Sequence, residues 1–467
     1  MKGTYERFRA VLHDLGYHYN VSTLARYSGI VITRHQLRQA LSVTIREHPA
    51  LGVRLSGKGE LTPRFVRLEK IDLDKMIHFS KVLPEDELDK FMSEQHSRGF
   101  DISATDLPLW RLVVFESRGD TPVTDIAFIY HHVIGDGKSG LAVHSTILRA
   151  LNSHSLHTSG EPPLPPTIGG QKQHSASPAL VTTSKRSLYP SLEQILSLSI
   201  STFTRVSMTL GPWFRYWPRK EDPGRWTGAP HHVENPNITK VRSIRIPALS
   251  VSRIVARCRT EQTTITPLFQ ILIGKAIFQT INATEGLRCA VAISLRRFIP
   301  LNFGYDDSVM GLWVSAFHLD YARTQLLSPK KFWDQVRGGT QKVRAEIAKG
   351  DKNLDSAMLQ FIPDFRTALL DKIGQKRENS FSITNVGIFD GDPPSQSETD
   401  GKERLRISDL TFSQSAHVNG SALNFCITSV KEGGMTVAIT WQEGTVSVED
   451  VERVAEALRR DLLEVAE

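Results

Sequence analysis

Two adjacent histidines, separated by three residues from an aspartate and a glycine, are the part of the chain best suited to chemistry. They are His131, His132, Asp136 and Gly137, written HHVIGDG. Chance would place this H-H-x-x-x-D-G pattern in a chain of this composition about 0.002 times. A neutral imidazole near pH 7 can accept a proton, so one histidine at a strand end is suited to act as a general base. Asp136 would then brace the turn.

Other chemistries fit this segment less well. Consecutive residues of a strand point to opposite faces, so His131 and His132 are poorly placed to chelate one metal ion, and no metal site is expected. No G-x-S-x-G nucleophile elbow occurs in the chain, which disfavours covalent catalysis. An isolated histidine at a strand end is more often structural, but Gly135 and Gly137 on either side of Asp136 favour a tight, functional turn.

The hydrophobic pattern predicts the elements that position this segment. The run TDIAFIY at 124–130 is apolar on both faces and leads into the two histidines, which indicates a strand inside a covered sheet. A capping box from Thr33 to Gln36 predicts a helix that ends before Pro49. Further helices are expected to begin at N-caps Thr266, Ser328 and Ser447. Further strands are expected at 64–68 and 110–115 and within VRSIRIPAL, CAVAISL, FSITNVG, ALNFCITSV and MTVAITW.

Composition excludes several classes of protein. The chain has 467 residues, 40% of them hydrophobic and 23% charged, which is typical of a globular protein and not of a disordered or polytopic membrane protein. Its three cysteines form no Cys-x-x-Cys pair and its N-terminus lacks the apolar run of a signal peptide, so a cytoplasmic protein is expected. The net charge of +7 is dispersed, so nucleic-acid binding is not expected.

A stretch rich in Ser, His, Thr and Pro divides the chain. Residues 152–190 include PPLPP and too few apolar side chains to pack, so we expect a mobile connector there. The predicted organisation is a first domain at 1–190, ending in this connector, and a second domain at 191–467. The stretch containing Trp213, Phe214 and Trp217 is too interrupted to span a membrane. Docking against the core and peripheral contact with an intracellular membrane both remain open for it.

HHVIGDG resembles the signature of the superfamily that contains chloramphenicol acetyltransferase, the BAHD acyltransferases and the condensation domains of peptide synthetases. Within it, the chain is most similar to the fungal and yeast alcohol O-acetyltransferases, through LRQALSVTIREHPAL, DLPLWRLVVF, AISLRRFIP, FSITNVGIF and MTVAITWQEG. The resemblance implies an α/β fold, an α+β sandwich of two chloramphenicol acetyltransferase-like domains with the active-site tunnel between them. It also implies a monomeric enzyme that moves an acyl group, expected to be acetyl, from coenzyme A to the hydroxyl of a small alcohol or secondary metabolite.

The resemblance assigns roles to the residues of the signature. His132 would be the general base, acting without an acyl-enzyme, and His131 would support it. Asp136 would be structural and would pair with an arginine from the second half, for which Arg296 stands at the matching position. Gly137 would allow a close turn. Acyl-CoA would be a co-substrate, and no permanently bound cofactor is implied.

The chain also departs from the plant BAHD pattern, because residues 409–413 read DLTFS where those enzymes carry D-F-G-W-G. The group that stabilises the oxyanion or contacts the acceptor is therefore open, with four polar residues as candidates: Ser413, Ser415, Thr384 and Asn385. A second open assignment concerns cations for the phosphates of coenzyme A. The candidates are Lys330, Lys331 and Arg337, and the alternative is an ordinary solvated helix face.

Two rival functions remain at this stage. The first is condensation-type chemistry on the same fold, with an amine acceptor or a carrier-protein thioester as donor. The second is a non-catalytic small-molecule binding protein of this fold, which the intact His132, Asp136 and Gly137 disfavour.

Overall fold

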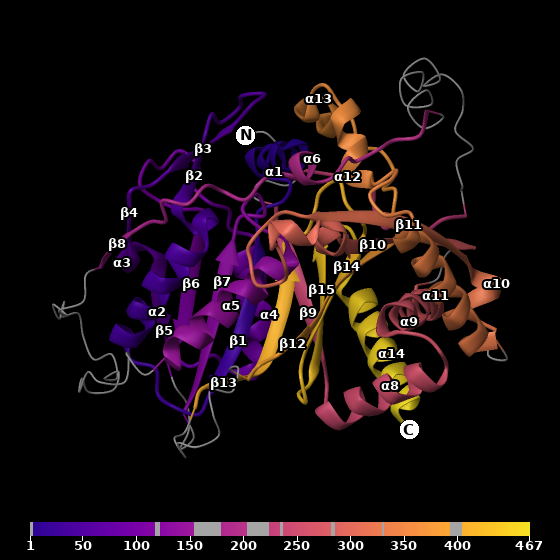
Figure 1. The fold of residues 1–467 in the computed structure, drawn as a ribbon. Helices are drawn as coiled ribbons and strands as arrows, with labels where there is room; N and C mark the ends of the chain where they lie inside the picture. The colour runs from indigo at the N-terminus through magenta and orange to yellow at the C-terminus, as the bar shows by residue number, and fades with distance from the viewer. Residues whose placement is uncertain are drawn as a thin grey trace.

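A computed structural model describes residues 3–116, 122–153, 179–202, 224–233, 237–281, 285–328, 331–392 and 404–467. Two mixed sheets lie side by side, and helices cover them (Figure 1). Most of the expected connector at 152–190 lies outside the described residues, as do Trp213, Phe214 and Trp217. No helix among the described residues is both long and apolar enough to cross a membrane.

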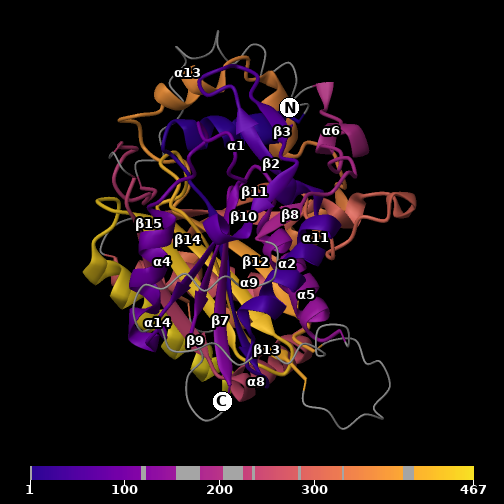
Figure 2. The same ribbon diagram turned by 90° about the vertical axis from the view of Figure 1, so that its left-hand side faces the viewer.

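The first sheet has five strands in the order β13-β1-β7-β6-β5. Their bounds are β13 (Arg406–Gln414), β1 (Val21–Ser28), β7 (Val123–Tyr130), β6 (Trp110–Phe115) and β5 (Ile77–Ser80). Helices α2 (Arg34–Glu47) and α5 (Gly137–Leu151) pack together on one side of β7, and α4 (Leu88–His96) lies on the other (Figure 2). Every residue of β7 after Val123 is buried, as its doubly apolar pattern predicts.

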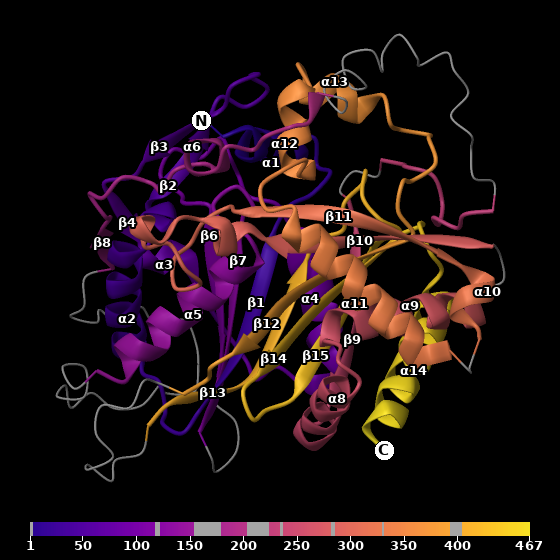
Figure 3. The ribbon, with the colours of Figure 1, turned by 45° about the vertical axis from the view of Figure 1, so that its right-hand side comes forward.

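The second sheet has six strands in the order β11-β10-β12-β14-β15-β9. Their bounds are β11 (Val314–Ala322), β10 (Gly286–Ser294), β12 (Phe381–Phe389), β14 (Leu423–Val430), β15 (Met435–Gln442) and β9 (Thr239–Ile246). Four long helices gather beside this sheet (Figure 3): α8 (Ala248–Thr260), α9 (Ile265–Thr280), α11 (Phe332–Ala348) and α14 (Val448–Ala466). Each sheet has its own large apolar core.

One strand joins the two halves. β13 comes from late in the chain, yet it pairs antiparallel with β1 and forms an edge of the first sheet. It also packs against β14 and β15 of the second sheet. The sequence did not reveal this crossover, because the pattern of a strand does not identify a partner that lies nearly 400 residues away.

A smaller layer lies at the end of the molecule where the chain begins (Figure 1). Helix α1 (Thr4–Asp14) contacts α13 (Phe365–Leu370), and Leu12, Phe365 and Val418 form a third apolar cluster. This layer places α1 close to the signature.

The remaining short elements of the fold are β2 (Val53–Ser56), β3 (Arg64–Arg67), β4 (Lys70–Asp72), α3 (Leu73–Met76), β8 (Leu180–Thr182), α6 (Leu192–Ile195), α10 (Arg323–Leu326) and α12 (Asp355–Met358).

The helix boundaries agree with two of the four predicted caps. Thr33 caps α2 through the expected box with Gln36, and the Ser447 hydroxyl accepts the Asp450 N–H at the start of α14. Two predicted starts were wrong. α9 begins with Thr264 as its N-cap instead of Thr266, since Pro267 fits inside the first turn, where its missing N–H costs nothing. The helix expected from Ser328 begins at Phe332.

Candidate active site

His132 is positioned by the turn that follows β7. Its Nδ1 lies 3.0 Å from the carbonyl oxygen of Gly135. Because a carbonyl oxygen only accepts, Nδ1 carries the proton and the neutral ring has its lone pair on Nε2. Burial, followed by the positive charge of Arg9, lowers the pKa of His132 well below its ordinary value. The imidazole is therefore neutral near pH 7 and able to accept a proton.

His131 has a different environment. Its Nδ1 accepts the backbone N–H of Val133 at 3.0 Å, and this local bond stabilises the turn after β7. Its ring stacks on His13 of α1, with the two centroids 4.3 Å apart. His131 therefore braces the loop and links it to α1, consistent with the supporting role expected for it.

Asp136 lies at the N-terminus of α5 and is almost fully buried. Oδ2 accepts from Arg296 Nη1 at 2.5 Å and from the backbone N–H of Trp313 at 3.2 Å. Oδ1 accepts the N–H groups of Lys138 and Ser139. Both carboxylate oxygens are therefore engaged in hydrogen bonds, and the structural role expected of Asp136 stays a prediction. The expected ion pair with Arg296 is present, and it connects the signature to the segment between β10 and β11.

Gly137 lies where strands of both sheets approach α5. A Cβ atom there would lie 2.7 Å from Val386 of β12 and 2.9 Å from the Phe412 ring of β13. Such distances do not occur between real side chains, so only glycine allows this approach. Gly137 does not adopt a positive φ, so the glycine expected to allow a close turn is needed here for packing and not for the backbone conformation.

A cluster of histidines surrounds His132, and sequence reasoning did not identify it. The His18 ring lies 5.5 Å from the His132 ring and 5.6 Å from the His417 ring, measured between centroids. His96 bonds to the Asn20 side chain and to Ser413, each at 2.6 Å. These histidines come from separate parts of the chain, so no spacing in the sequence relates them.

The candidate oxyanion serines lie beside this cluster. The Ser415 hydroxyl accepts the N–H groups of Tyr19 and Asn20, at 2.9 and 3.1 Å, and still has its own proton to donate. The Ser413 hydroxyl bonds to His96. Their assignment as oxyanion donors stays a prediction.

The candidates on β12 lie on the other side of Gly137. Asn385 donates to the Thr266 hydroxyl at 3.1 Å and accepts the Gly387 N–H at 2.9 Å. Thr384 pairs with Cys426 of β14 in the register of the sheet. Their assignment, too, stays a prediction, and the Asn385 amide would first have to leave Thr266.

The candidate cations for coenzyme A lie elsewhere in the fold. Lys330 is outside the described residues, and Lys331 directly precedes α11. Arg337 is paired with Glu261 at 2.6 Å and with Asp334 at 2.5 Å. Helix α11 packs on α9, far from β7 (Figure 3). Contact between these cations and coenzyme A remains a prediction, and for Arg337 it would have to replace two carboxylates.

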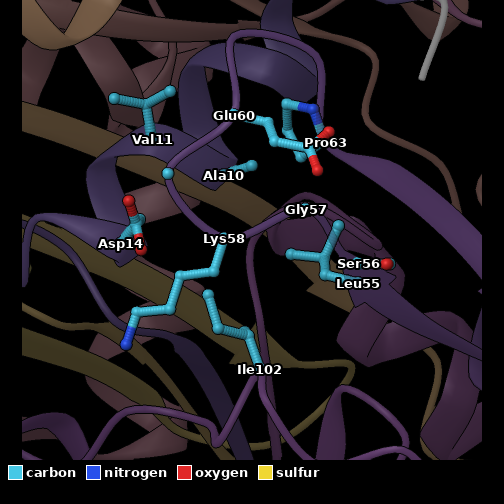
Figure 4. A pocket seen from close by; sticks show the side chains of 11 residues that line it. Ala10, Val11, Asp14, Leu55, Ser56, Gly57, Lys58, Glu60, Pro63 and Ile102 are labelled. Atoms are coloured by element: carbon cyan, nitrogen blue, oxygen red, sulfur yellow. The ribbon is translucent and has the colours of Figure 1, made fainter.

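Three cavities lie near the signature. Figure 4 shows a small one between α1 and the turn after β2, lined by Ala10, Asp14 and Lys58 among others. A cavity of about 420 Å³ adjoins it and is lined by His13, which stacks on His131. A third, of about 50 Å³, is lined by Glu6 and by Val133 and Ile134 of the signature itself. Across the described residues, no group of three acidic, histidine or cysteine side chains is arranged to hold a metal ion.

Comparison with solved structures establishes the class of fold. The chain is similar to the TRI3 trichothecene 15-O-acetyltransferase from Fusarium sporotrichioides, with a TM-score of 0.70 and 14% identity over 99% of this chain and 94% of that one. It is also similar to the first condensation domain of the calcium-dependent antibiotic synthetase, with a TM-score of 0.59 and 14% identity over 100% and 95%. The expected two-domain, chloramphenicol acetyltransferase-like fold is confirmed.

Sequence comparison establishes the family. The alcohol acetyltransferase family model matches residues 2–462, so the chain belongs to the alcohol acetyltransferase family. Similar curated proteins include the probable alcohol acetyltransferase crmB of Aspergillus fumigatus, 27% identical over 98% of both chains. Another is the probable alcohol acetyltransferase FCK4 of Fusarium pseudograminearum, 24% identical over 92% of this chain and 86% of that one. The protein is an O-acyltransferase that uses acyl-CoA and an alcohol.

Proposed function

We propose that the enzyme transfers an acetyl group from acetyl-CoA to the hydroxyl of a small alcohol or secondary metabolite, with His132 as the general base. The observation that supports this most directly is the bond from His132 Nδ1 to the Gly135 carbonyl, which directs the lone pair to Nε2. The lowered pKa keeps that nitrogen unprotonated. Relatives named as alcohol acetyltransferases support the choice of reaction.

The transfer takes place in one ternary complex. His132 Nε2 accepts the hydroxyl proton as the alcohol oxygen attacks the thioester carbonyl, and a tetrahedral oxyanion forms. The carbon–sulfur bond then breaks, the ester leaves, and the coenzyme A thiolate takes the proton from His132. No bond forms between enzyme and acyl group. Asp136 and Arg296 take no part in proton transfer and hold the turn in place.

The oxyanion needs a donor, and Ser415 is the one we propose first. Its hydroxyl already accepts two N–H groups from the segment that carries His18, so its proton is directed away from them. Loss of one oxyanion donor typically costs roughly 3 kcal/mol in the transition state. We therefore expect Ser415→Ala to lower kcat and leave KM for the donor nearly unchanged.

A condensation-type reaction is the rival on the same fold, and the likeness to a condensation domain is the observation that favours it. The two differ in the donor, which is free acyl-CoA in one and a carrier-protein thioester in the other. Free coenzyme A should inhibit our enzyme competitively against acetyl-CoA. No inhibition, together with turnover of an acylated carrier protein, would favour the rival.

The direct test of the function is an acceptor screen. Purified enzyme is incubated with acetyl-CoA and a panel of primary and secondary alcohols. Release of free coenzyme A is measured with a colorimetric thiol assay, and ester products are identified by mass spectrometry. We expect thiol release that depends on the alcohol and an ester of matching mass. A parallel series of longer acyl-CoA donors defines the acyl length. Thiol release without ester would contradict the proposal.

The cellular setting completes the proposal. We propose that the enzyme is a cytoplasmic monomer. We also propose that any contact with a membrane surface is made by the segment around Trp213, Phe214 and Trp217. Gel filtration tests the monomer, and sedimentation with phospholipid vesicles tests the contact.

A further inference from the structure

Helix α1 lies along the active site and carries a cation with no anionic partner. His13 of α1 stacks on His131, and Phe8 lies 6.4 Å from the His417 ring, centroid to centroid. Between them is Arg9, whose Nη2 donates to the Tyr5 hydroxyl at 2.6 Å and whose guanidinium lies over the Tyr5 ring. Its Nε is buried and unbonded. Within the described ranges, no carboxylate pairs with Arg9.

The groups around Arg9 do not offset its charge. Its positive charge acts on His18, His131, His132 and His417 and helps lower the pKa of each, after burial as the larger cause. These imidazoles are therefore neutral, and a net positive charge remains beside the base. Arg9 is only partly exposed, so its charge is incompletely solvated and an anionic ligand there would compensate it.

His18 offers a second unused polar atom at the same place. Its Nε2 is buried and has no hydrogen-bond partner in the described structure. Its ring lies next to that of His132, 5.5 Å between centroids. At that separation the two rings are in contact, so an N–H on His18 Nε2 lies close to a hydroxyl bound at His132.

We propose that Arg9 and His18 form an anion-binding subsite that holds a carboxylate on the hydroxyl-bearing substrate. This inference rests on the proposed function and names the class of acceptor, a hydroxycarboxylate. Arginine binds carboxylate through a planar fork of N–H donors, and the charge pair is strongest where water is excluded. His18 contributes a neutral donor to the same group.

The phosphates of coenzyme A are the other anionic group that Arg9 could bind. Their distance from the thioester within the acyl-CoA molecule disfavours this assignment. The reacting thioester must lie at His132, and the whole pantetheine arm separates the thioester from the phosphates. A cation close to the base is therefore far from those phosphates. A phosphate-free donor, acetyl-N-acetylcysteamine, separates the two sources by experiment.

The experiment compares charge on the enzyme with charge on the acceptor. Salicylate, mandelate and 3-hydroxybutyrate are tested against their methyl esters, both for turnover with acetyl-CoA and for binding by calorimetry. We expect the wild type to prefer the carboxylates. Arg9→Gln should reduce kcat/KM for the carboxylates by roughly 10- to 100-fold more than for the esters. His18→Asn should show a smaller loss in the same direction.

Two controls make the result decisive. Arg46→Gln removes the same charge from the exposed face of α2 and should keep the preference for carboxylates. Arg9→Lys keeps the charge without the fork and should lose part of the preference. The proposal is overturned if the wild type binds and acetylates acids and esters alike, or if Arg9→Gln slows both alike. It is also overturned if the effect of Arg9→Gln disappears with acetyl-N-acetylcysteamine.

These outcomes are distinct from failure of the proposed function. If neutral alcohols are acetylated and His132→Ala abolishes the reaction, the proposed function stands whatever Arg9 does. Calorimetric binding of the carboxylates also needs no turnover, so the subsite is tested even where no acceptor reacts.

Discussion

His132 has a fixed tautomer, and the nearby positive charge of Arg9 disfavours its protonation. Burial and Arg9 lower its pKa well below the ordinary value of about 6.5. Since only the neutral ring accepts a proton, activity is lost only when the pH falls through this lowered value. We therefore expect kcat/KM to stay constant from pH 8 down to about pH 6. A pH–rate profile measures this, and a decline with its midpoint near 6.5 would contradict it.

Asp136 supports a prediction about stability at the same scale. Asp136→Asn removes the negative charge and leaves Arg296 buried without its partner. Breaking a buried pair in this way costs about 3 to 5 kcal/mol in the free energy of unfolding. Urea denaturation measures the loss. The matched control is Lys138→Gln, whose partner Asp307 is exposed, so its cost should be at most about 1 kcal/mol. Equal losses in the two variants would count against a structural role for Asp136.

At the scale of elements, α1 carries another ionisable group besides Arg9, the Glu6 carboxyl. Burial raises the pKa of Glu6 from 4.5 to about 7, and one of its oxygens has no partner in the described structure. The folded protein therefore keeps a proton that the unfolded chain releases. The free energy of unfolding should consequently fall as the pH rises from about 4.5 to about 7.

Replacement of Glu6 isolates this effect. Glu6→Gln cannot ionise, so it should stabilise the protein by on the order of 2 kcal/mol at pH 8 and have little effect at pH 4.5. Thermal unfolding at both pH values measures the difference. Glu94→Gln, at an exposed position on α4, should change neither. A Glu6→Gln variant with the same shift at both pH values would disprove the assignment.

The elements also show where a sequence is informative. β6 and β7 could be predicted because most of their side chains are apolar. The caps Thr33 and Ser447 could be predicted because a cap is a local hydrogen bond. The start of α9 was missed by two residues because Thr264 and Thr266 are equally good caps by type. The pairing of β13 with β1 could not be predicted, since local pattern carries no information about a distant partner.

At the scale of the whole molecule, the site is built from both halves. β7 supplies His132, the segment after β10 supplies Arg296, and the chain after β13 brings Ser415 and His417 beside α1. His132, Asp136 and Arg296 could be found from sequence because a motif or a family resemblance marks them. Arg9, His18 and His417 could not, because they meet only when the two sheets and the layer of α1 assemble.

Because β13 belongs to both halves of the molecule, we predict that the two halves unfold cooperatively. β13 pairs with the first sheet and packs on the second, and Phe412 at its centre is buried against Gly137. Phe412→Ala should cost about 3 to 5 kcal/mol and lower a single calorimetric transition. Two separate transitions, with only one shifted, would show that the halves unfold independently.

The central claim is that His132 is the base for direct acetyl transfer, and the comparison of the two neighbouring histidines tests it best. The measurement is acetyl-CoA-dependent ester formation by the wild type, His132→Ala and His131→Ala, with folding of each variant checked by circular dichroism. We predict that His132→Ala lowers kcat by roughly 100-fold or more. His131→Ala should keep a much larger share of kcat, because His131 bonds to the Val133 backbone. Turnover by folded His132→Ala at the rate of the wild type would contradict the account.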